Sequence, residues 1–555
     1  MAITNLIKFD NLRNDILGGV TTAIVSVPLA LTFGMAALQS PIAGLYGAIC
    51  VGFFAALFGG TPTLISEPTG PMTVVMTSVV AGLTASAPDR ETGIAMAFTV
   101  VMLAGLFQVV FGFFKLGKYI TLMPYSVVSG FMSGIGVILI ILQIPAILGQ
   151  AAPKGGVIGV IKNLPNLLTG INTPDLILGG LTLAIIFLIP SKWKRYCPPQ
   201  LLALVLGTIV SVIAFNGTDI RRIGVIPVGL PEFRFPVFTP EQATQIFVDG
   251  LVLGMLGCID TLLTAVIADS LTRTQHDSDK ELIGQGIGNI VSGFCGGLPG
   301  AGATMGTVVN IQTGAKTAVS GICRALVLLV IVLGAAPLMQ NIPMAVLAGI
   351  AVKVGIDILD WSFLKRAHIV SLRGALIMYG VLALTVLVDL IVAVGVGVFI
   401  ANILTIEKLS NLQSQEVRTI TDSDDDMPLS ALEKELLNQA KGKVLLFYLS
   451  GPMIFGVAKA IAREHNAMQK VDTIIIDLGD VPMLGVTASL AIENVIKEAV
   501  EEGRNVFLAG AKGATKIRLQ RLGVLDLIPP ENQVADRRIA LETVVAGLRT
   551  ADVAV

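Results

Sequence analysis

Apolar segments follow one another along most of this chain. From about residue 15 to about residue 404, apolar runs of roughly spanning length alternate with short polar loops. A helix of about 20 apolar residues crosses the hydrocarbon core of a bilayer, so the pattern is typical of a polytopic α-helical membrane protein. The pattern predicts spans at about residues 15–38, 42–58, 70–83, 92–114, 119–148, 175–190, 200–215, 243–270, 283–295, 303–313, 317–338, 343–359, 371–387 and 390–406.

The composition supports this interpretation. Hydrophobic residues make up 54% of the 555 residues and charged residues only 14%, with a mean hydropathy of +0.80. A soluble core of this size would lack a polar surface, so the lipid bilayer is the expected surroundings. The net charge of −1 gives no electrostatic reason to expect nucleic acid. The five cysteines form no C-x-x-C pair, which predicts structural thiols and no metal cofactor.

Two stretches rich in glycine and proline interrupt the apolar pattern. They are SEPTGPMTVV at residues 66–75 and GGLPGAGATMGTVV at residues 296–309. We expect each to open the backbone and restart as a half-helix, near Thr69 and Ala303. Helix N-termini attract anions through unpaired N–H groups, and Thr69 and Thr304 would add hydroxyls. The sequence therefore predicts an anion site where the two ends meet; the alternative is that the glycines only allow close helix packing.

A carboxylate stands in the middle of a predicted span. Asp260, in GCIDTLLTAVIADSL, is costly there unless it is paired, hydrated or functional. Thr264 lies one turn along on the same helical face, and the freed carbonyl of Gly302 would point toward a cation. These oxygens predict a site for a hard monovalent cation such as sodium. Protonation of Asp260 is the main alternative, and a neutral Asp in a helix contact is a third.

The two halves of the apolar region resemble each other. The proline and glycines of residues 124–136 recur with the same spacing at residues 343–355, and the two interruptions align in the same order. We therefore predict a structural duplication, with repeat 1 at about residues 15–216 and repeat 2 at about residues 243–406. Each half has seven predicted spans, an odd number, so the copies should lie inverted in the membrane.

Loop charges orient the predicted spans. If residues 1–14 are a cytoplasmic segment, the cytoplasmic loops carry most of the Lys and Arg residues, including the basic loop at 192–195. Arg221 and Arg222 are a counterexample in an outer loop. The positive-inside rule predicts that both termini lie in the cytoplasm. As a transporter, the protein is expected in the plasma (inner) membrane.

After residue 406 the composition becomes that of a soluble domain. Residues 407–434, which include an acidic cluster at 422–426, are expected to be a linker. Strand and helix patterns then alternate, which predicts a small cytoplasmic α/β domain at residues 435–555. Its strands are expected at about residues 443–450, 472–479 and 505–511.

The runs EPTGPMTVV, GCIDTLLTAVIADSLTRTQHDS and GGLPGAGATMGTVVNIQTG, together with the C-terminal α/β domain, resemble the SulP anion transporters. The resemblance covers nearly the whole chain. It implies seven plus seven inverted spans, with the first four of each half forming a core and the last three forming a gate. It also implies that the core moves against the gate like an elevator. The C-terminal domain is similar to STAS domains, which implies a homodimer.

The same resemblance implies sodium-dependent bicarbonate uptake by symport, with sodium as the coupling ion. It places bicarbonate near Thr69, Ala303 and Thr304, at the facing half-helix ends. It places sodium near Asp260, Thr264, Gly302 and Thr304.

Other functions remain open from the residues alone. A proton-coupled transporter, or an uncoupled transporter or channel for another anion such as sulfate, could use the same half-helix donors. A membrane receptor that signals through its C-terminal domain is a further class. No G-x-x-x-x-G-K-[ST] motif is present, which argues against an ATP-driven pump, and no enzyme activity is expected.

Overall fold

The computed structural model describes residues 4–5, 7–120, 124–190, 198–215, 217–224, 229–388, 390–421, 429–454, 458–460, 463 and 471–553. The chain divides into two compact units, Met1–Ile400 and Ala401–Val555. The basic loop at 192–195 and the acidic cluster at 422–426 lie outside the described residues.

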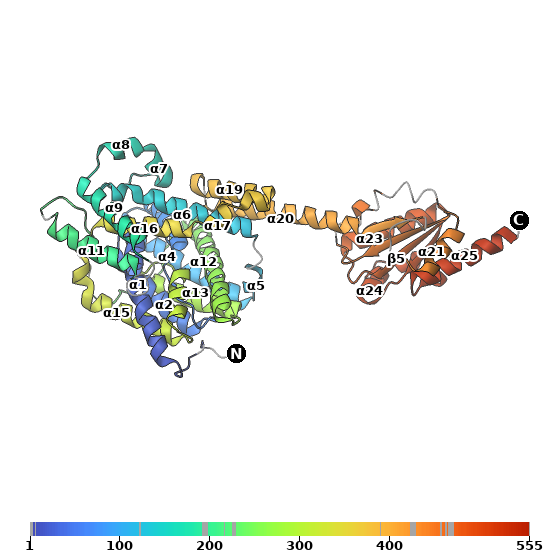
Figure 1. Cartoon of the computed structure of the whole chain (residues 1–555), viewed down its shortest axis with the longest axis horizontal. Coiled ribbons are helices and arrows are strands. Elements are labelled where there is room, and N and C mark those ends of the chain that lie inside the picture. The colour runs from blue at the N-terminus through green and yellow to red at the C-terminus, as the bar shows by residue number, and fades with distance from the viewer. Residues whose placement is uncertain are drawn as a thin grey trace. The chain divides into compact units, whose positions relative to one another are not determined.

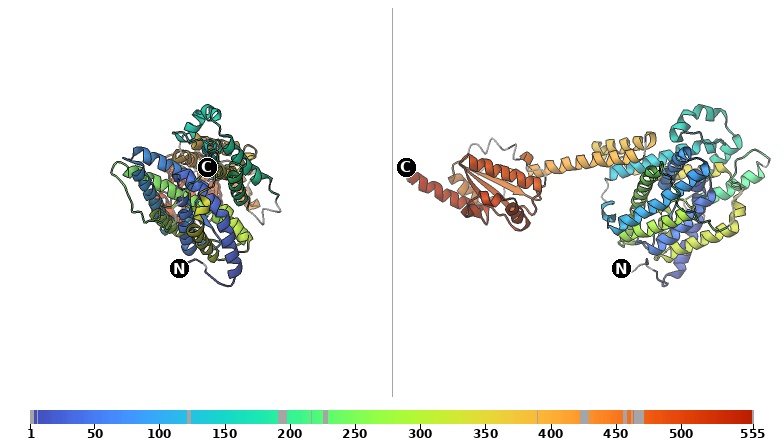
Figure 2. Two further views of the ribbon diagram at one scale, coloured as in Figure 1. Left: turned by 90° about the vertical axis from the view of Figure 1, so that its left-hand side faces the viewer. Right: turned by 180° about the vertical axis from the view of Figure 1, so that it is seen from behind.

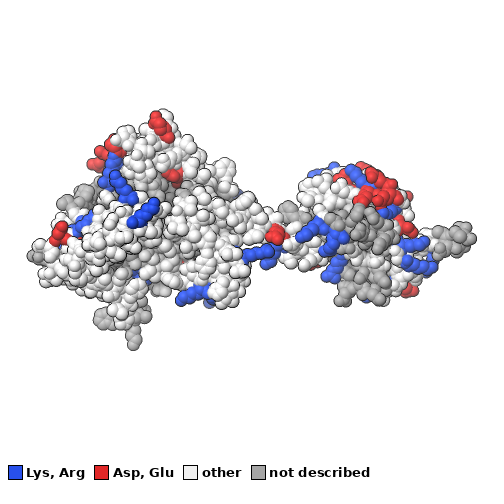
Figure 3. All heavy atoms as spheres, turned by 90° about the horizontal axis from the view of Figure 1, so that it is seen from above, with Lys and Arg blue, Asp and Glu red and all other residues white. Residues whose placement is uncertain are grey.

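The apolar segments predicted to span the membrane are helical (Figure 1). Six helices in the described part of the chain are long and apolar enough to cross a membrane. Charged side chains are sparse on the face of this unit shown in Figure 3. The long helices are α1 (Leu12–Leu38), α2 (Pro41–Phe58), α3 (Gly70–Ser86), α4 (Arg90–Phe113), α6 (Tyr125–Ile147), α9 (Thr173–Leu188), α11 (Pro199–Ile213), α12 (Ala243–Thr272), α13 (Ser278–Phe294), α14 (Thr304–Gln312), α15 (Val319–Met339), α16 (Met344–Ile358), α19 (Leu372–Leu387) and α20 (Leu390–Gln415). Short helices lie between them: α5 (Gly117–Ile120), α7 (Gly156–Lys162), α8 (Leu164–Thr169), α17 (Trp361–Leu364) and α18 (Ala367–Val370).

The long helices pack mainly within two groups. In one group α2 contacts α1, α13 and α15, and α4 contacts α12 and α13. In the other, α6 contacts α16 and α19, and α9 contacts α11 and α16. Smaller contacts join the groups, chiefly between α1 or α3 and α6, α11 or α16. The first group contains the half-helices α3 and α14, and the second contains α6, α9, α11, α16 and α19. The assignment of these groups as core and gate stays a prediction.

Two short strands pair at the centre of the first group. β1 (Ser66–Glu67) pairs antiparallel with β2 (Ala301–Gly302), with Ser66 opposite Gly302. Backbone polar groups that leave a helix inside a membrane protein need partners, and this pairing supplies them. The antiparallel direction is the one expected if the two interruptions belong to inverted copies.

Two glycines with equivalent places in the predicted repeats face each other. A Cβ added to Gly136 on α6 would lie 2.6 Å from the carbonyl oxygen of Gly355 on α16. A Cβ added to Gly355 would lie 2.8 Å from the carbonyl oxygen of Gly136. The N-cap residues of the two helices, Pro124 and Pro343, are equivalent as well. The inverted duplication stays a prediction, and this reciprocal contact supports it.

The second unit is an α/β domain with a five-stranded sheet in the order β3-β4-β5-β6-β7. β3 pairs antiparallel with β4, and the remaining neighbours are parallel. Apolar clusters cover both faces of the sheet, one with α23 and α24 and the other with α21 and α25 (Figures 1 and 2). The elements are β3 (Val417–Ile420), α21 (Ala431–Gln439), β4 (Val444–Ser450), β5 (Thr473–Asp480), α23 (Val486–Glu501), β6 (Asn505–Ala509), α24 (Gly513–Arg521), the 3-10 turns η1 (Val524–Leu527) and η2 (Pro530–Asn532), β7 (Gln533–Val534) and α25 (Arg537–Val553).

The expected linker at residues 407–434 is wrong in part. Its first residues continue α20 to Gln415, and β3 follows as an edge strand of the sheet. Val417 and Ile420 are fully buried, which holds this short strand in the domain although it contains two polar residues. The α/β domain therefore begins earlier than residue 435.

Candidate functional site

Both half-helices begin beside a short extended segment. α3 begins at Gly70 with Thr69 as its N-cap, and α14 begins at Thr304 with Ala303 as its N-cap. Neither N-cap side chain caps its helix. First-turn N–H groups have no acceptor within their own helix, so each end offers donors and the positive end of a dipole. The breaks near Thr69 and Ala303 thus occur where the glycines and prolines predicted them.

The backbone N–H of Ala303, one of the donors predicted for the anion, already has a hydrogen-bond acceptor within the protein. The Ala303 N–H donates to the carbonyl oxygen of Ile65 at 2.8 Å, which continues the pairing of β1 with β2. The structure therefore corrects the expectation that this N–H is offered to an anion, because strand pairing takes it. The donors of α14 begin at Thr304, and the place of Ala303 beside an anion stays a prediction.

Three of the oxygens predicted for sodium lie together. The Thr264 hydroxyl on α12 donates to the carbonyl oxygen of Gly302 at 2.8 Å and lies 3.0 Å from the Thr304 hydroxyl. One turn earlier, the Thr261 hydroxyl accepts the N–H of Gly302 at 3.0 Å. Thr261 and Thr264 are buried. Helix α12 therefore holds β2 in place and brings a carbonyl and two hydroxyls to the start of α14.

The fourth predicted sodium ligand contacts the other half-helix. Asp260 is buried on α12, and its Oδ2 accepts the hydroxyl hydrogen of Thr69 at 2.7 Å. Thr69 was predicted to face the anion, yet in this structure its hydroxyl hydrogen goes to the carboxylate. A negative charge beside the positive end of α3 is favourable. Asp260 and Thr264 thus tie both half-helix ends to one face of α12.

A buried arginine side chain beside this site was not among the predicted site residues. Arg324 on α15 is fully buried and forms an ion pair with Glu67 of β1. Its guanidinium also donates to the Ser26 hydroxyl at 2.9 and 3.1 Å and to the carbonyls of Ala48 and Ser66 at 3.3 and 3.2 Å. An Arg with this many partners satisfies its donors inside an apolar bundle. The one sequence feature that could have indicated this residue is that Arg324 is a charged side chain inside the predicted span at residues 317–338.

Glu67 therefore has a structural partner. From its place just before α3, this carboxylate could equally face the transport pathway or stabilise a loop or the helix dipole. In the structure Glu67 is buried and paired with Arg324, which lies 257 residues further along the chain. The pair joins β1 to α15 and keeps the extended segment at the centre of the bundle.

Two more buried carboxylates, those of Asp15 and Glu281, accept backbone N–H groups near the ends of neighbouring helices. Asp15 accepts the N–H of Lys316 at 2.8 Å, before the start of α15. Glu281 accepts the N–H groups of Gly60 and Thr61, each at 2.8 Å, after the end of α2. Both carboxylates satisfy backbone donors where the helical ladder stops, which is a structural task.

Two other contacts between titratable side chains lie outside this centre. Lys353 and Asp357, four residues apart on α16, form an ion pair at 2.5 Å, as residues at this spacing on a helix commonly do. His276 Nδ1 lies 2.6 Å from the carboxylate of Asp269, near the end of α12. Neither pair contacts the half-helix ends. Among the described residues, no group of His, Cys, Asp and Glu side chains has the arrangement of a metal site.

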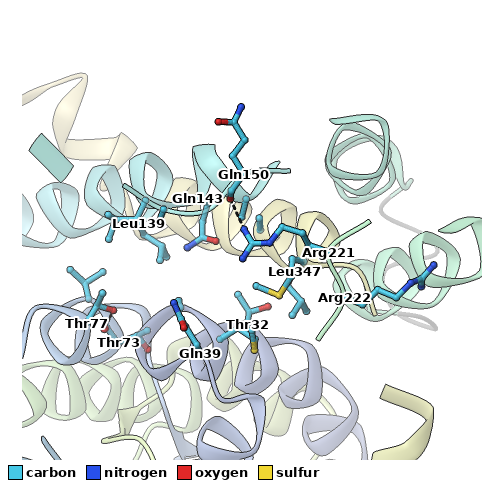
Figure 4. Close-up of a pocket in the computed structure, with 18 residues that line it drawn as sticks. Thr32, Gln39, Thr73, Thr77, Leu139, Gln143, Gln150, Arg221, Arg222 and Leu347 are labelled. Carbon is cyan, nitrogen blue, oxygen red and sulfur yellow. Dashed lines mark hydrogen bonds between the residues drawn. The ribbon is translucent and has the colours of Figure 1, made fainter. Parts of the chain in front are cut away.

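A cavity of about 370 Å³ separates the two helix groups near this centre. Thr32 and Gln39 of α1 and Thr73 of α3 line one side, and Leu139 and Gln143 of α6 line the other (Figure 4). The hydroxyl of Thr73 donates to the carbonyl oxygen of Thr69 at 2.7 Å. The cavity thus reaches within one helical turn of the contact between Thr69 and Asp260.

Comparison with known proteins agrees with this architecture. The model of the sulfate permease family matches residues 12–381, and the model of the STAS domain matches residues 436–537. The chain is 63% identical over 548 residues to the bicarbonate transporter BicA of Synechocystis sp., covering 99% of this chain and 97% of that protein. It is 61% identical over 550 residues to the bicarbonate transporter BicA of Picosynechococcus sp., with coverage of 99% and 97%.

Solved structures give the same result. The transmembrane domain of a cyanobacterium bicarbonate transporter BicA matches with a TM-score of 0.68 and 64% identity, covering 71% of this chain and 100% of that chain. The structure of SLC26A9 matches with a TM-score of 0.82 over 98% of this chain and 92% of that chain. At 18% identity, SLC26A9 shows a shared fold alone.

The helical bundle with two broken helices and a C-terminal STAS domain defines a multi-pass membrane transporter, not an enzyme. The chain belongs to the sulfate permease family, named SulP above.

Proposed function

We propose that this protein takes up bicarbonate together with sodium across the plasma membrane, with both termini in the cytoplasm. Two relatives more than 60% identical over nearly their whole length are named bicarbonate transporters, which supports the anion. The arrangement around α12 supports the cation. Sulfate is the less favoured substrate, because the relatives named as putative sulfate transporters are only 28–29% identical.

The observation that carries the proposal is the placement of Asp260, Thr264, Gly302 and Thr304. These residues gather a carboxylate, a carbonyl and hydroxyls beside two helix N-termini. Oxygen ligands suit a hard cation, and helix N-termini suit an anion. A sodium ion and a bicarbonate ion bound side by side would neutralise each other and reduce the cost of holding either charge away from water.

Coupling also has an energetic reason. Moving one negative charge against a membrane potential costs about 2.3 kcal/mol per 100 mV. A sodium ion that enters with the bicarbonate cancels this term, and the inward sodium gradient then drives accumulation. An anion channel on the same fold would let bicarbonate follow the potential outward.

The movement and the assembly are further parts of the proposal. The half-helices, α12 and α15 pack in one helix group, and the cavity lies between that group and the other. Sliding of the first group against the second would carry the bound ions across the membrane as an elevator. The STAS domain would join two copies as a homodimer.

The test replaces Asp260 while keeping the protein in the membrane. In proteoliposomes, Asp260→Asn should abolish the sodium-stimulated part of labelled bicarbonate uptake. Asp269→Asn removes a carboxylate from the same helix, away from the half-helix ends, and should keep it. Equal sodium stimulation in the two variants would contradict the proposal.

The same assay separates the proton-coupled alternative. With sodium absent, an inward proton gradient should raise bicarbonate accumulation by the unmodified protein no more than in protein-free liposomes, where CO2 that crosses the bilayer forms bicarbonate in the alkaline lumen. Accumulation driven by protons and lost in Asp260→Asn would assign Asp260 to proton transfer.

A further inference from the structure

The cavity between the two helix groups has a cationic entrance. Arg221 and Arg222, in the segment between α11 and α12, are the charged residues among those that line it. No acidic residue is among the described residues that line this cavity. With the topology proposed above, this segment and the C-terminal end of α1 face the outside. Arg221 and Arg222 therefore place positive charge on the lining of the entrance, and the buried Asp175 of α9 lies close enough to interact electrostatically with both.

The two arginines do different things. Arg222 donates to the Ser211 hydroxyl at 3.0 Å and to the carbonyl oxygen of Asn341 at 2.6 Å, and points away from the cavity (Figure 4). Arg221 extends into the space between α1 and α6, with one nitrogen donating to the carbonyl oxygen of Gln150 at 2.6 Å (Figure 4). A guanidinium has five N–H donors, so this single bond leaves others for an anion.

Neutral donors surround the Arg221 side chain. Gln39 and Gln143 point into the same space from α1 and α6 (Figure 4). Arg90 donates to the Gln39 Oε1 at 2.8 Å, so the Gln39 amide nitrogen is the end left for a ligand. Among the described residues, the Gln143 side chain has no hydrogen-bond partner that would compete. A guanidinium with nearby amide N–H groups matches the oxygens of a small planar oxyanion.

The cavity also extends from this entrance toward the half-helix end of α3. Thr73 and Thr77 line its side along α3, and the Thr73 hydroxyl bonds to the carbonyl of Thr69. Thr69 in turn contacts Asp260. The lining of the cavity therefore extends from Arg221 to the first turns of α3, next to the half-helix end at Thr69.

We propose that Arg221, with the amides of Gln39 and Gln143, forms an outer anion-binding site that captures bicarbonate before it reaches the half-helix ends. The inference rests on the proposed function for its ligand and direction. Arg221 is a binding residue in this scheme, and Arg222 anchors the loop that carries it.

Electrostatic capture has a recognisable kinetic signature. A cation at a cavity mouth raises the local anion concentration and the association rate, and its effect falls as salt increases. Removing the charge of Arg221 should therefore raise the bicarbonate concentration needed for half-maximal influx and leave the maximal rate nearly unchanged. A purely structural Arg221 would instead lower the maximal rate or the amount of folded protein.

The experiment measures initial bicarbonate influx by the full-length protein in proteoliposomes of known orientation, at saturating sodium. Arg221→Gln should raise the KM for bicarbonate about 3- to 10-fold, and Arg221→Lys should restore most of the affinity. Lys162→Gln removes an exposed charge of the same sign from α7, outside the cavity, and should leave KM unchanged. Adding choline chloride should raise KM in the unmodified protein and have little effect in Arg221→Gln.

Three results would contradict the proposed role of Arg221. An unchanged KM in Arg221→Gln, or an equal rise in Lys162→Gln, would remove Arg221 from the entrance. If Arg221→Gln fails to fold, Arg221→Lys with a lost salt dependence would do the same. The sodium response of Asp260→Asn tests the proposed function separately, so the outer site can fail while symport stands.

Discussion

The hydroxyl of Thr69 donates to the Asp260 carboxylate at 2.7 Å, and so joins the N-cap of one half-helix to the middle of α12. This contact links a residue predicted to bind the anion with one predicted to bind the cation. It gives a structural reason for the two ions to depend on each other, because moving either residue moves the other.

Thr69 should therefore control sodium dependence. A hydrogen bond to a charged group contributes about 1.5–3 kcal/mol, which corresponds to a tenfold or greater change in affinity. We expect Thr69→Val to raise the sodium concentration for half-maximal bicarbonate uptake roughly 10-fold. Thr69→Ser keeps the hydroxyl and should stay near the unmodified value. Equal sodium dependence in the Val and Ser variants would show that this contact has no part in coupling.

The ion pair between Glu67 and Arg324 should decide whether the centre folds. Removing one partner of a buried pair leaves an uncompensated charge and costs about 3–5 kcal/mol. Arg324→Ala should therefore yield little monodisperse protein in detergent, and Glu67→Gln with Arg324→Gln should recover part of the yield. Gel filtration and thermal inactivation measure both effects. A double variant no better than Arg324→Ala would mean that the hydrogen bonds of Arg324 matter more than its charge.

The contact between Gly136 and Gly355 should be intolerant of a methyl group. A Cβ at either position lies within 2.8 Å of a backbone carbonyl oxygen, so α6 and α16 must separate. Overpacking of this kind costs about 1–3 kcal/mol, and we expect Gly136→Ala and Gly355→Ala to lower the thermal midpoint by several degrees. Gly380→Ala on α19 is the control, because nothing lies within 4 Å of its added Cβ. The same midpoint in all three variants would contradict the packing.

The STAS domain should lose stability in acid through Glu433. Burial raises the pKa of this carboxyl, but hydrogen bonds from the Ser430 N–H and the Arg537 guanidinium outweigh it and lower the pKa overall. A carboxyl whose pKa is lower when folded contributes stability above its unfolded pKa, and loses it as pH falls through the folded value. The stability difference between the unmodified protein and Glu433→Gln should begin to shrink as pH falls below about 6, and should go on shrinking until pH has passed below the lowered pKa of the folded state. Hydrogen exchange of α21 in the full-length chain measures it, and a constant difference would exclude this role.

Much of the site could be predicted because its signals are local. Glycine and proline are clustered in residues 66–75 and 296–309, and such clusters predict breaks close to the observed starts of α3 and α14. Single prolines inside α1, α6 and α15 do not end those helices. Asp260 and Thr264 share a helical face by spacing alone. The contact of Thr264 with Gly302 then follows once β2 packs on α12.

Other features depend on contacts between distant segments, and no local pattern reveals them. The two-residue strands β1 and β2 are too short to show a period, and their pairing uses the Ala303 N–H. Arg324 looks like one costly charge in a span until Glu67 is placed beside it. In the same way, β3 looked like a linker, because four residues give too little pattern to indicate a strand.

The central claim is that sodium entry drives bicarbonate uptake. The direct measurement is accumulation of labelled bicarbonate in proteoliposomes with an inward sodium gradient, equal pH on both sides and the membrane potential clamped at zero. Bicarbonate should rise above its external concentration, and fall back when an ionophore removes the sodium gradient. Uptake that stops at the external concentration with the gradient intact would contradict the account.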